Sequence, residues 1–209
     1  MIQRLRIAVF ASGSGSNFQA LADAVRTGKL DADIELLVCD KPEAPVVQRA
    51  VTAGIETFVF RPKDYPSREV YESEILGKLR EKKIDLVVLA GYMRIVTHVL
   101  VDAYWGRMIN VHPSLLPSFP GLHAVRQALQ HGVKITGVTV HLVDGGLDSG
   151  PILAQRAMEI RPEDTETTLA GRMHEIEHEL YPRVVQAIAD GSIKLEQIVT
   201  SIEKDGMKS

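Results

Sequence analysis

The stretch RIAVFASGSGSN, residues 6–17, indicates the fold because an apolar run passes directly into a Gly/Ser turn. Arg6–Ala11 is typical of a buried β-strand, and a helix is expected from Phe18 to Thr27, after the turn. The order strand, turn and helix is the beginning of a βαβ unit. The same order recurs along the following residues.

Short apolar runs alternate with amphipathic stretches through the first ninety residues. Asp85–Ala90 is apolar almost without interruption, as in a strand that is covered on both faces. The alternation predicts a parallel sheet with right-handed crossovers. In this part we expect strands at Ile34–Cys39, Thr57–Phe60 and Asp85–Ala90, and helices at Val46–Ala53 and from a Ser67 cap to about Lys83.

The second half is less regular, since three prolines in residues 113–120 exclude a long helix or a central strand there. A cis peptide bond is expected at Leu116–Pro117, in this tight turn. No change of composition marks a linker, so residues 1–209 are expected to form one α/β domain. The expected elements are strands at Met108–His112, Thr136–His141 and Ile152–Ile160, and helices at Ala124–His131 and from about Thr165 to Ala189.

Composition and charge exclude several classes of protein. Of the 209 residues 45% are apolar and 24% are charged, which is typical of a globular chain. The net charge is −3 and no Lys/Arg run reaches five residues, so the basic surface of a nucleic-acid binder is not expected. No apolar stretch approaches the roughly 18 residues that span a membrane. The single cysteine, Cys39, lies in an apolar run and is expected to be buried in a cytoplasmic protein.

The Gly/Ser turn Ser12–Asn17 is a candidate anion site, because backbone N–H groups at the start of a helix point toward an anion. Phe18 occupies the position of the third glycine in a dinucleotide fingerprint, and a Walker lysine is missing. A single phosphate therefore fits better than a pyrophosphate. A plain strand–helix turn is the alternative, and so is a nicotinamide site with Asp40 as its ribose-binding acid.

Asn110 and His112 share one face of an expected strand, because residues two apart in a strand point the same way. An amide donor beside an imidazole is suited to a developing oxyanion. Asp148 lies in the Gly-rich loop Asp144–Gly150 and would orient His112 if the two met. Without such a contact, these are a strand-end histidine and a surface aspartate.

His174–His178 matches the zinc-protease signature H-E-x-x-H. Helical phase opposes a zinc site, because both histidines lie away from the apolar stripe of their helix. Glu177 falls at the edge of that stripe and could receive a substrate amine or hydroxyl. The stripe consists of Leu169, Met173, Ile176, Leu180 and Val184.

Several segments together resemble the phosphoribosylglycinamide formyltransferases, folate-dependent enzymes of purine synthesis. They lie in family order over most of the chain, and NVHPSLLP is the most specific piece. The matching segments are SGSGSN at 12–17, SRE at 67–69, LAGYMRI at 89–95, NVHPSLLPSFPGLHA at 110–124, LDSGPIL at 147–153 and HEIEHELYP at 174–182.

The resemblance implies a Rossmann-like formyltransferase fold: a mostly parallel sheet with helices on both faces and an antiparallel element in the C-terminal half. It implies two lobes, about residues 1–100 for the phosphate and about 101–209 for folate and catalysis. The family often carries an acidic residue where this chain has Gly145-Gly146, which bears on individual loop contacts and not on the reaction.

The resemblance also implies a role for each group of residues. Asn110, His112 and Asp148 would be catalytic, Gly15, Ser16 and Asn17 would hold the substrate phosphate, and His174, Glu175, Ile176 and Glu177 would hold its ribose or glycinamide end. The folate-binding residues would be Arg68, Met93, Arg94, Ile95, Val96, Asn110, Asp144, Gly145, Gly146, Leu147 and Asp148. From Gly91–Val96 alone, a post-strand loop with apolar walls would suit a flat heterocycle.

The implied reaction passes a formyl group from 10-formyltetrahydrofolate, a co-substrate, to the amine of phosphoribosyl glycinamide, without a metal. The partners would be these small molecules, with neither nucleic acid nor membrane, and the protein a monomer or homodimer. Formyltetrahydrofolate deformylase is one alternative, but we expect an extra N-terminal domain there. Methionyl-tRNA formyltransferase would need a further RNA-binding domain. A non-catalytic nucleotide-binding module would leave residues 110–153 unexplained.

Overall fold

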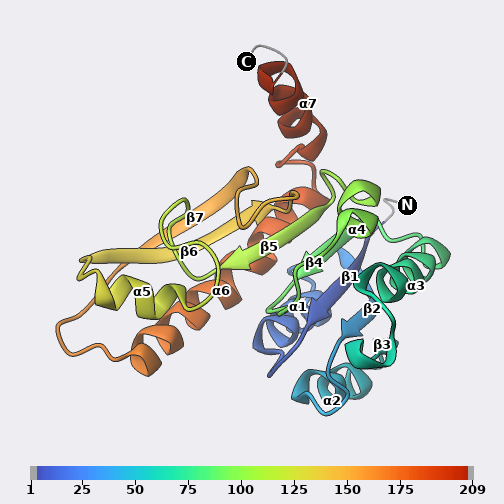
Figure 1. The fold of residues 1–209 in the computed structure, drawn as a ribbon, viewed down its shortest axis with the longest axis horizontal. Helices are drawn as coiled ribbons and strands as arrows, with labels where there is room; N and C mark the ends of the chain where they lie inside the picture. The colour runs from blue at the N-terminus through green and yellow to red at the C-terminus, as the bar shows by residue number, and fades with distance from the viewer. Residues whose placement is uncertain (1–3, 207–209) are drawn as a thin grey trace.

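The computed structural model describes residues 4–206 of the chain, so residues 1–3 and 207–209 of the expected domain lie outside the described part. One seven-stranded sheet runs through the molecule in the order β3-β2-β1-β4-β5-β6-β7 (Figure 1). Its strands are β1 Leu5–Ala11, β2 Ala32–Cys39, β3 Thr57–Val59, β4 Leu86–Leu89, β5 Met108–His112, β6 Ile135–Leu142 and β7 Ile152–Glu159.

The first five strands are parallel to one another, β6 pairs antiparallel with β5, and β7 pairs antiparallel with β6. The expected α/β fold, with a parallel sheet and an antiparallel element in the C-terminal half, is confirmed. The sheet is continuous from β4 to β5, so the two proposed lobes share one set of strands.

The helices are close to those expected from the sequence, with two additions. They are α1 Ser16–Arg26, α2 Pro45–Thr52, α3 Arg68–Glu81, α4 His98–Ala103, α5 Ala124–Gln130, α6 Glu166–Ala189 and α7 Leu195–Gly206, with a 3₁₀ turn at Pro62–Asp64. The helices α4, which is too short to show a period, and α7 were not expected from the sequence. The spacing of Leu195, Ile198 and Val199, which pack against the core, could have indicated α7. Ser67 stands at the N-cap of α3, but its side chain makes no capping hydrogen bond.

Alternate residues of the central strands pack into two different cores. Val9 and Val88 belong to the core under α1, α2 and α6, whereas Phe10 and Val87 belong to the core under α3 and α4 (Figure 1). This two-sided burial is why β1 and β4 are apolar without interruption. Because both faces of the sheet are covered, the carboxyl ends of the parallel strands remain open, and this is where ligands bind in such sheets.

The proline-rich segment after β5 is fastened to β6 by a single hydroxyl. Thr139 Oγ1 donates to the carbonyl of Ser114 at 2.7 Å and accepts from the amide of Leu116 at 3.0 Å. The Leu116–Pro117 peptide bond is cis, as expected. The polypeptide that follows His112 is therefore folded back over the neighbouring strand.

Cys39 is fully buried, as expected, and burial raises the pKa of its thiol. This environment opposes a role as a nucleophile. Within residues 4–206, none of the helices combines the length and the apolar composition needed to cross a bilayer.

Tyr181 of α6 joins the long helix to two neighbouring strands. Its fully buried hydroxyl lies 2.9 Å from the carbonyl oxygen of Leu89 in β4 and 3.1 Å from that of Ile109 in β5. The single hydroxyl proton is therefore donated to two carbonyl oxygens on neighbouring strands. Burial raises the pKa of this phenol well above its usual range, so it remains a donor.

Replacing Tyr181 with Phe should lower the free energy of unfolding by about 1–3 kcal/mol, because two buried carbonyl groups lose their shared donor. Urea denaturation would measure the change. Tyr65→Phe is the matched control, since the Tyr65 hydroxyl donates to Glu74 at an exposed site and should cost less than about 0.5 kcal/mol. Equal losses in the two variants would contradict the role given to Tyr181.

Candidate active site

The Gly/Ser turn leads from β1 into α1 as expected, and close packing shapes it. Gly15 adopts a φ of 74°, and a Cβ there would lie 2.5 Å from a methyl carbon of Val46 in α2, so only glycine fits. Arg49 of α2 donates from Nε to the carbonyl of Ser14 at 2.8 Å.

The first helical hydrogen bond of α1 runs from the amide of Gln19 to the carbonyl of Gly15, which leaves the amides at the start of α1 without partners within the helix. Gly15, Ser16 and Asn17 thus stand where an anion would be held.

A buried carboxyl group of α6 lies against this turn. Asn17 donates from Nδ2 to Oε2 of Glu177 at 2.7 Å, and both side chains are buried. Burial raises the pKa of Glu177, although the hydrogen bond from Asn17 and the charge of His174 act in the opposite direction. The burial of Glu177 was expected from helical phase, but its contact with Asn17, which is 160 residues away, was not.

The rest of the H-E-x-x-H segment faces elsewhere. His174 and Glu175 are exposed and Ile176 is half-buried, and the rings of His174 and His178 stack on each other with centroids 6.3 Å apart. In the part of the chain that the structure describes, His, Cys, Asp and Glu side chains form no group of three that could hold a metal ion. Of the four residues expected at the substrate, Glu177 is the one that contacts the Gly/Ser turn, through Asn17.

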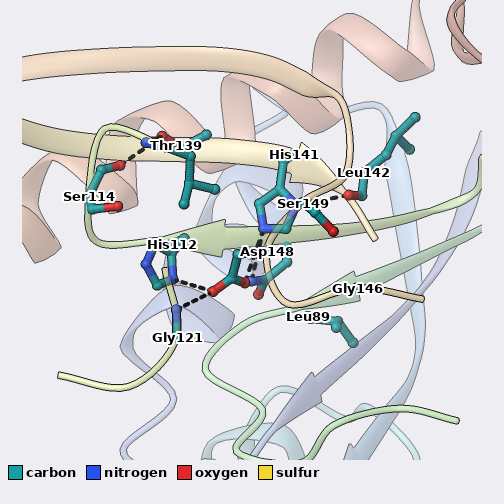
Figure 2. Close-up of polar contacts among 12 residues, drawn as sticks. Leu89, His112, Ser114, Gly121, Thr139, His141, Leu142, Gly146, Asp148 and Ser149 are labelled. Carbon is teal, nitrogen blue, oxygen red and sulfur yellow. Dashed lines mark hydrogen bonds and ion pairs between the residues drawn. The ribbon is translucent and has the colours of Figure 1, made fainter. Parts of the chain in front are cut away.

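Asp148 lies between two histidines from neighbouring strands (Figure 2). Its Oδ2 is 3.4 Å from Nδ1 of His112 on β5, and its Oδ1 is 3.5 Å from Nε2 of His141 on β6. Asn110 completes the cluster, with Nδ2 at 3.3 Å from Nε2 of His141. The three residues expected to be catalytic, Asn110, His112 and Asp148, are therefore brought together.

His141 was not among the residues singled out from the sequence. Antiparallel pairing of β5 with β6 places it directly opposite Asn110, and its side chain is almost fully buried. A signal was present, because His141 shares a strand face with Thr139 and stands three residues before Asp144. A histidine at that strand end would have been a candidate once the antiparallel register was known.

In each imidazole, the ring nitrogen that does not face Asp148 has its own partner, which indicates where a proton lies. Nε2 of His112 is 2.9 Å from the carbonyl of Phe119, and Nδ1 of His141 is 2.8 Å from the carbonyl of Leu142. A carbonyl oxygen only accepts, so each of these ring nitrogens carries a proton. Both nitrogens of His112 thus face oxygen atoms, and an imidazolium there would have an acceptor for each proton.

The Asp148 carboxylate is stabilised in its charged form. The hydrogen bond from His141 makes the largest contribution to lowering the pKa of Asp148 to about 2, and the Gly121 amide, at 2.7 Å, and the charge of His112 add to it against the effect of burial. Asp148 adopts a φ of 51°, a left-handed conformation that aspartate tolerates better than most residues. The loop thus holds an ionised carboxylate between two imidazoles.

The loop before Asp148 is closed by Asp144, which was expected to contact folate. The Asp144 carboxylate accepts from the amide of Gly146 at 3.0 Å and from the hydroxyl of Ser149 at 3.0 and 3.1 Å. A Cβ at Gly146 would overlap the Ser149 hydroxyl at 2.0 Å. Gly145 and Leu147 are exposed at the tip of the loop. Asp144 therefore shapes the loop that carries Asp148.

The loop after β4 exposes two of the side chains expected at folate. Met93 is 64% exposed and Ile95 is 69% exposed, while Val96 is half-buried. Arg94 forms an ion pair with Asp40, Nε to Oδ2, at 2.7 Å. Asp40 is therefore engaged by an arginine, which does not support its reading as a ribose-binding acid. Arg68, also expected at folate, is an exposed residue of the first turn of α3.

The chain matches the family described as formyl transferase over residues 5–185. Phosphoribosylglycinamide formyltransferase of Bacillus subtilis is 49% identical over 88% of this chain and 94% of its own length. A trifunctional purine biosynthetic protein of Drosophila melanogaster is 44% identical over 95% of this chain, which spans 15% of that longer protein. A crystal structure of glycinamide ribonucleotide transformylase 1 from Geobacillus kaustophilus superposes with a TM-score of 0.87 at 52% identity, over 89% of this chain and 99% of the other. These likenesses confirm the resemblance stated from the sequence.

The pKa of Asp148 generates a prediction on stability in acid. Because this pKa is lower in the folded chain than in the unfolded one, ionised Asp148 stabilises the fold above about pH 4, and the contribution is lost as the pH falls toward 2. The loss of stability in Asp148→Asn should therefore be larger at about pH 5 than at about pH 3. Urea denaturation at both values would measure it, and a loss that grew toward pH 3 would contradict the argument.

Proposed function

Since the chain belongs to the formyl transferase family, we propose that it transfers the formyl group of 10-formyltetrahydrofolate to the amine of 5-phosphoribosyl glycinamide, in purine biosynthesis. The contact of Asp148 with His112, which unites the groups the reaction needs, is the observation that carries the proposal. We place the activity in a single domain in the cytoplasm, with the lobe before about residue 100 for the phosphate and the lobe after it for folate and catalysis.

Substrate binding follows from the two ends of the site. The free amides of Gly15, Ser16 and Asn17 at the start of α1 hold the phosphate, since they present donors and the positive end of a helix dipole. Glu177 keeps one oxygen on Asn17 and offers the other to a ribose hydroxyl or to the glycinamide. The folate contacts come from Arg68, from the loop Met93–Val96 and from the loop Asp144–Asp148.

In the chemical step the amine nitrogen bonds to the formyl carbon, and charge develops on the formyl oxygen of a tetrahedral intermediate. Asn110 and protonated His112 stabilise this charge, and donors of this kind typically contribute about 2.7–4 kcal/mol each. In the structure Nε2 of His112 points to the carbonyl of Phe119, so the imidazole must exchange that contact for the formyl oxygen. The charge is then stabilised by protein donors, and the proposal needs no metal.

Collapse of the intermediate breaks the bond from the formyl carbon to N10 of the folate. One proton leaves the amine and one proton reaches N10, so that the products are neutral at both nitrogens. Asp148 orients the imidazole of His112, and His112 carries the proton from the amine toward N10. A water molecule relays the proton if His112 does not reach both nitrogens directly. His141 supports the same carboxylate from the other side.

The proposal predicts that loss of the formyl donor requires the amine substrate. Purified protein with 10-formyltetrahydrofolate should turn it over only when phosphoribosyl glycinamide is added, as followed by absorbance of the folate product. If the formyl folate is consumed equally fast without the amine, the protein is a deformylase and the proposal is wrong. If it is not consumed even with both substrates present, the protein is a non-catalytic binding module.

Replacing Asp148 with Asn should lower kcat/KM by about 10²–10⁴, because His112 loses the carboxylate that orients it. His112→Ala should lower it by a similar factor. The control is Asp190→Asn at the exposed C-terminus of α6, which should retain the parent rate. Near-parental turnover in either Asp148→Asn or His112→Ala, with folding verified by circular dichroism, would end the catalytic assignment.

A further inference from the structure

The connection between β4 and α4, residues 91–97, presents exposed apolar side chains on a backbone that is tied to buried polar groups. This segment, called here the β4–α4 loop, lacks regular secondary structure. Met93 and Ile95 are its exposed apolar residues, whereas the Tyr92 ring turns inward and packs edge-on against Phe10, with centroids 5.3 Å apart. Its conformation must therefore be set by contacts outside the loop.

The first half of the loop is fastened to the ends of β1 and β2. The amide of Ser12 donates to the carbonyl of Gly91 at 3.0 Å, and the hydroxyl of Ser12 accepts from the amide of Met93 at 2.8 Å. Asp40, whose side chain is entirely buried, accepts from Nε of Arg94. The ion pair holds the Arg94 guanidinium at the end of β2, while the apolar side chains of Met93 and Ile95 remain exposed.

The second half is fastened to α3 by one carboxylate. Glu72 is 1% exposed, and both of its oxygens accept from the amide of Thr97 at 3.0 Å, while Oε2 also accepts from the Thr97 hydroxyl at 2.6 Å. The same hydroxyl accepts from the amide of Val99 and so caps α4. Thr97 thus joins the end of the loop to two helices.

Two buried acidic side chains, Asp40 and Glu72, hold this one irregular loop. Burying an acidic group costs free energy unless hydrogen bonds or an opposite charge compensate it. A loop that is ordered before its ligand arrives avoids the entropy cost of ordering on binding. We propose that Asp40 and Glu72 are positioning residues, which hold the β4–α4 loop in the conformation that receives the flat heterocycle of the folate co-substrate. This inference rests on the proposed function, and neither residue is required to touch the ligand.

Kinetics can separate positioning from general stabilisation. Loss of an anchor should raise KM for the formyl folate by about tenfold, because hydrogen bonds to charged groups are among the stronger ones in proteins. KM for phosphoribosyl glycinamide and kcat at saturating folate should change by less than about threefold. A purely structural contribution would alter both substrates together, or would lower only the amount of folded protein.

The variants are chosen as matched pairs. Asp40→Ala removes the partner of Arg94, and its control, Asp164→Ala, removes another buried aspartate that pairs with an arginine, at the start of α6. Thr97→Val removes the hydroxyl that donates to Glu72 at nearly constant volume, and Thr97→Ser retains it. The anchor variants should show the selective rise in folate KM. Asp164→Ala should not show it, and Thr97→Ser should restore parental behaviour.

A second measurement does not depend on activity. Amide hydrogen exchange at residues 93–96 of the substrate-free protein should be faster in Asp40→Ala and Thr97→Val than in the parent, Asp164→Ala and Thr97→Ser. If Asp40→Ala does not fold, Asp40→Asn tests the same ion pair, because it removes the negative charge that faces Arg94 at nearly constant volume. Unchanged exchange together with unchanged folate KM would overturn the inference, whereas a parent protein without transfer activity would overturn the proposed function alone.

Discussion

The antiparallel pairing of β5 with β6 is the constraint on which the site depends. It sets Asn110 opposite His141 and His112 opposite Thr139, so that two imidazoles and an amide lie on one face of the sheet. Asp148 reaches both histidines from the following loop and is fixed there by the amide of Gly121.

The Asp148 carboxylate has a polar partner at each of its oxygen atoms. An ionised carboxylate in a largely buried position is costly by itself, but here it faces two imidazoles and a backbone amide. The Asp144 turn and the Thr139 hydroxyl then hold the two polypeptide segments that bring these groups together. Polar groups whose hydrogen bonds are satisfied in this way form a rigid arrangement, which suits donors that must be ready before charge develops.

Local patterns were enough to foresee much of the fold and part of the site. The apolar runs around Val9 and Val88 indicated strands covered on both faces, and the period of two placed Asn110 and His112 together. Contacts between distant segments carried no local signal. His141 becomes a clear candidate once the strand register is known, and the hydrogen bond from Asn17 to Glu177 joins residues that are 160 positions apart. The ribose reading of Asp40 stayed open as an alternative, because the arginine that pairs with it lies 54 residues away in the sequence.

The shared hydroxyl of Tyr181 has a consequence for the shape of acceptable substrates. It ties β4 and β5 to the turn of α6 that also carries Glu177, so hydrogen bonds join the Ser12–Asn17 turn, the Glu177 carboxyl group and the strands beside His112 into one frame. Under the proposed function, this frame would set the span from the amides at the α1 N-terminus to Asn110 and His112. A phosphorylated amine of another length would then not bring its nitrogen to the formyl carbon.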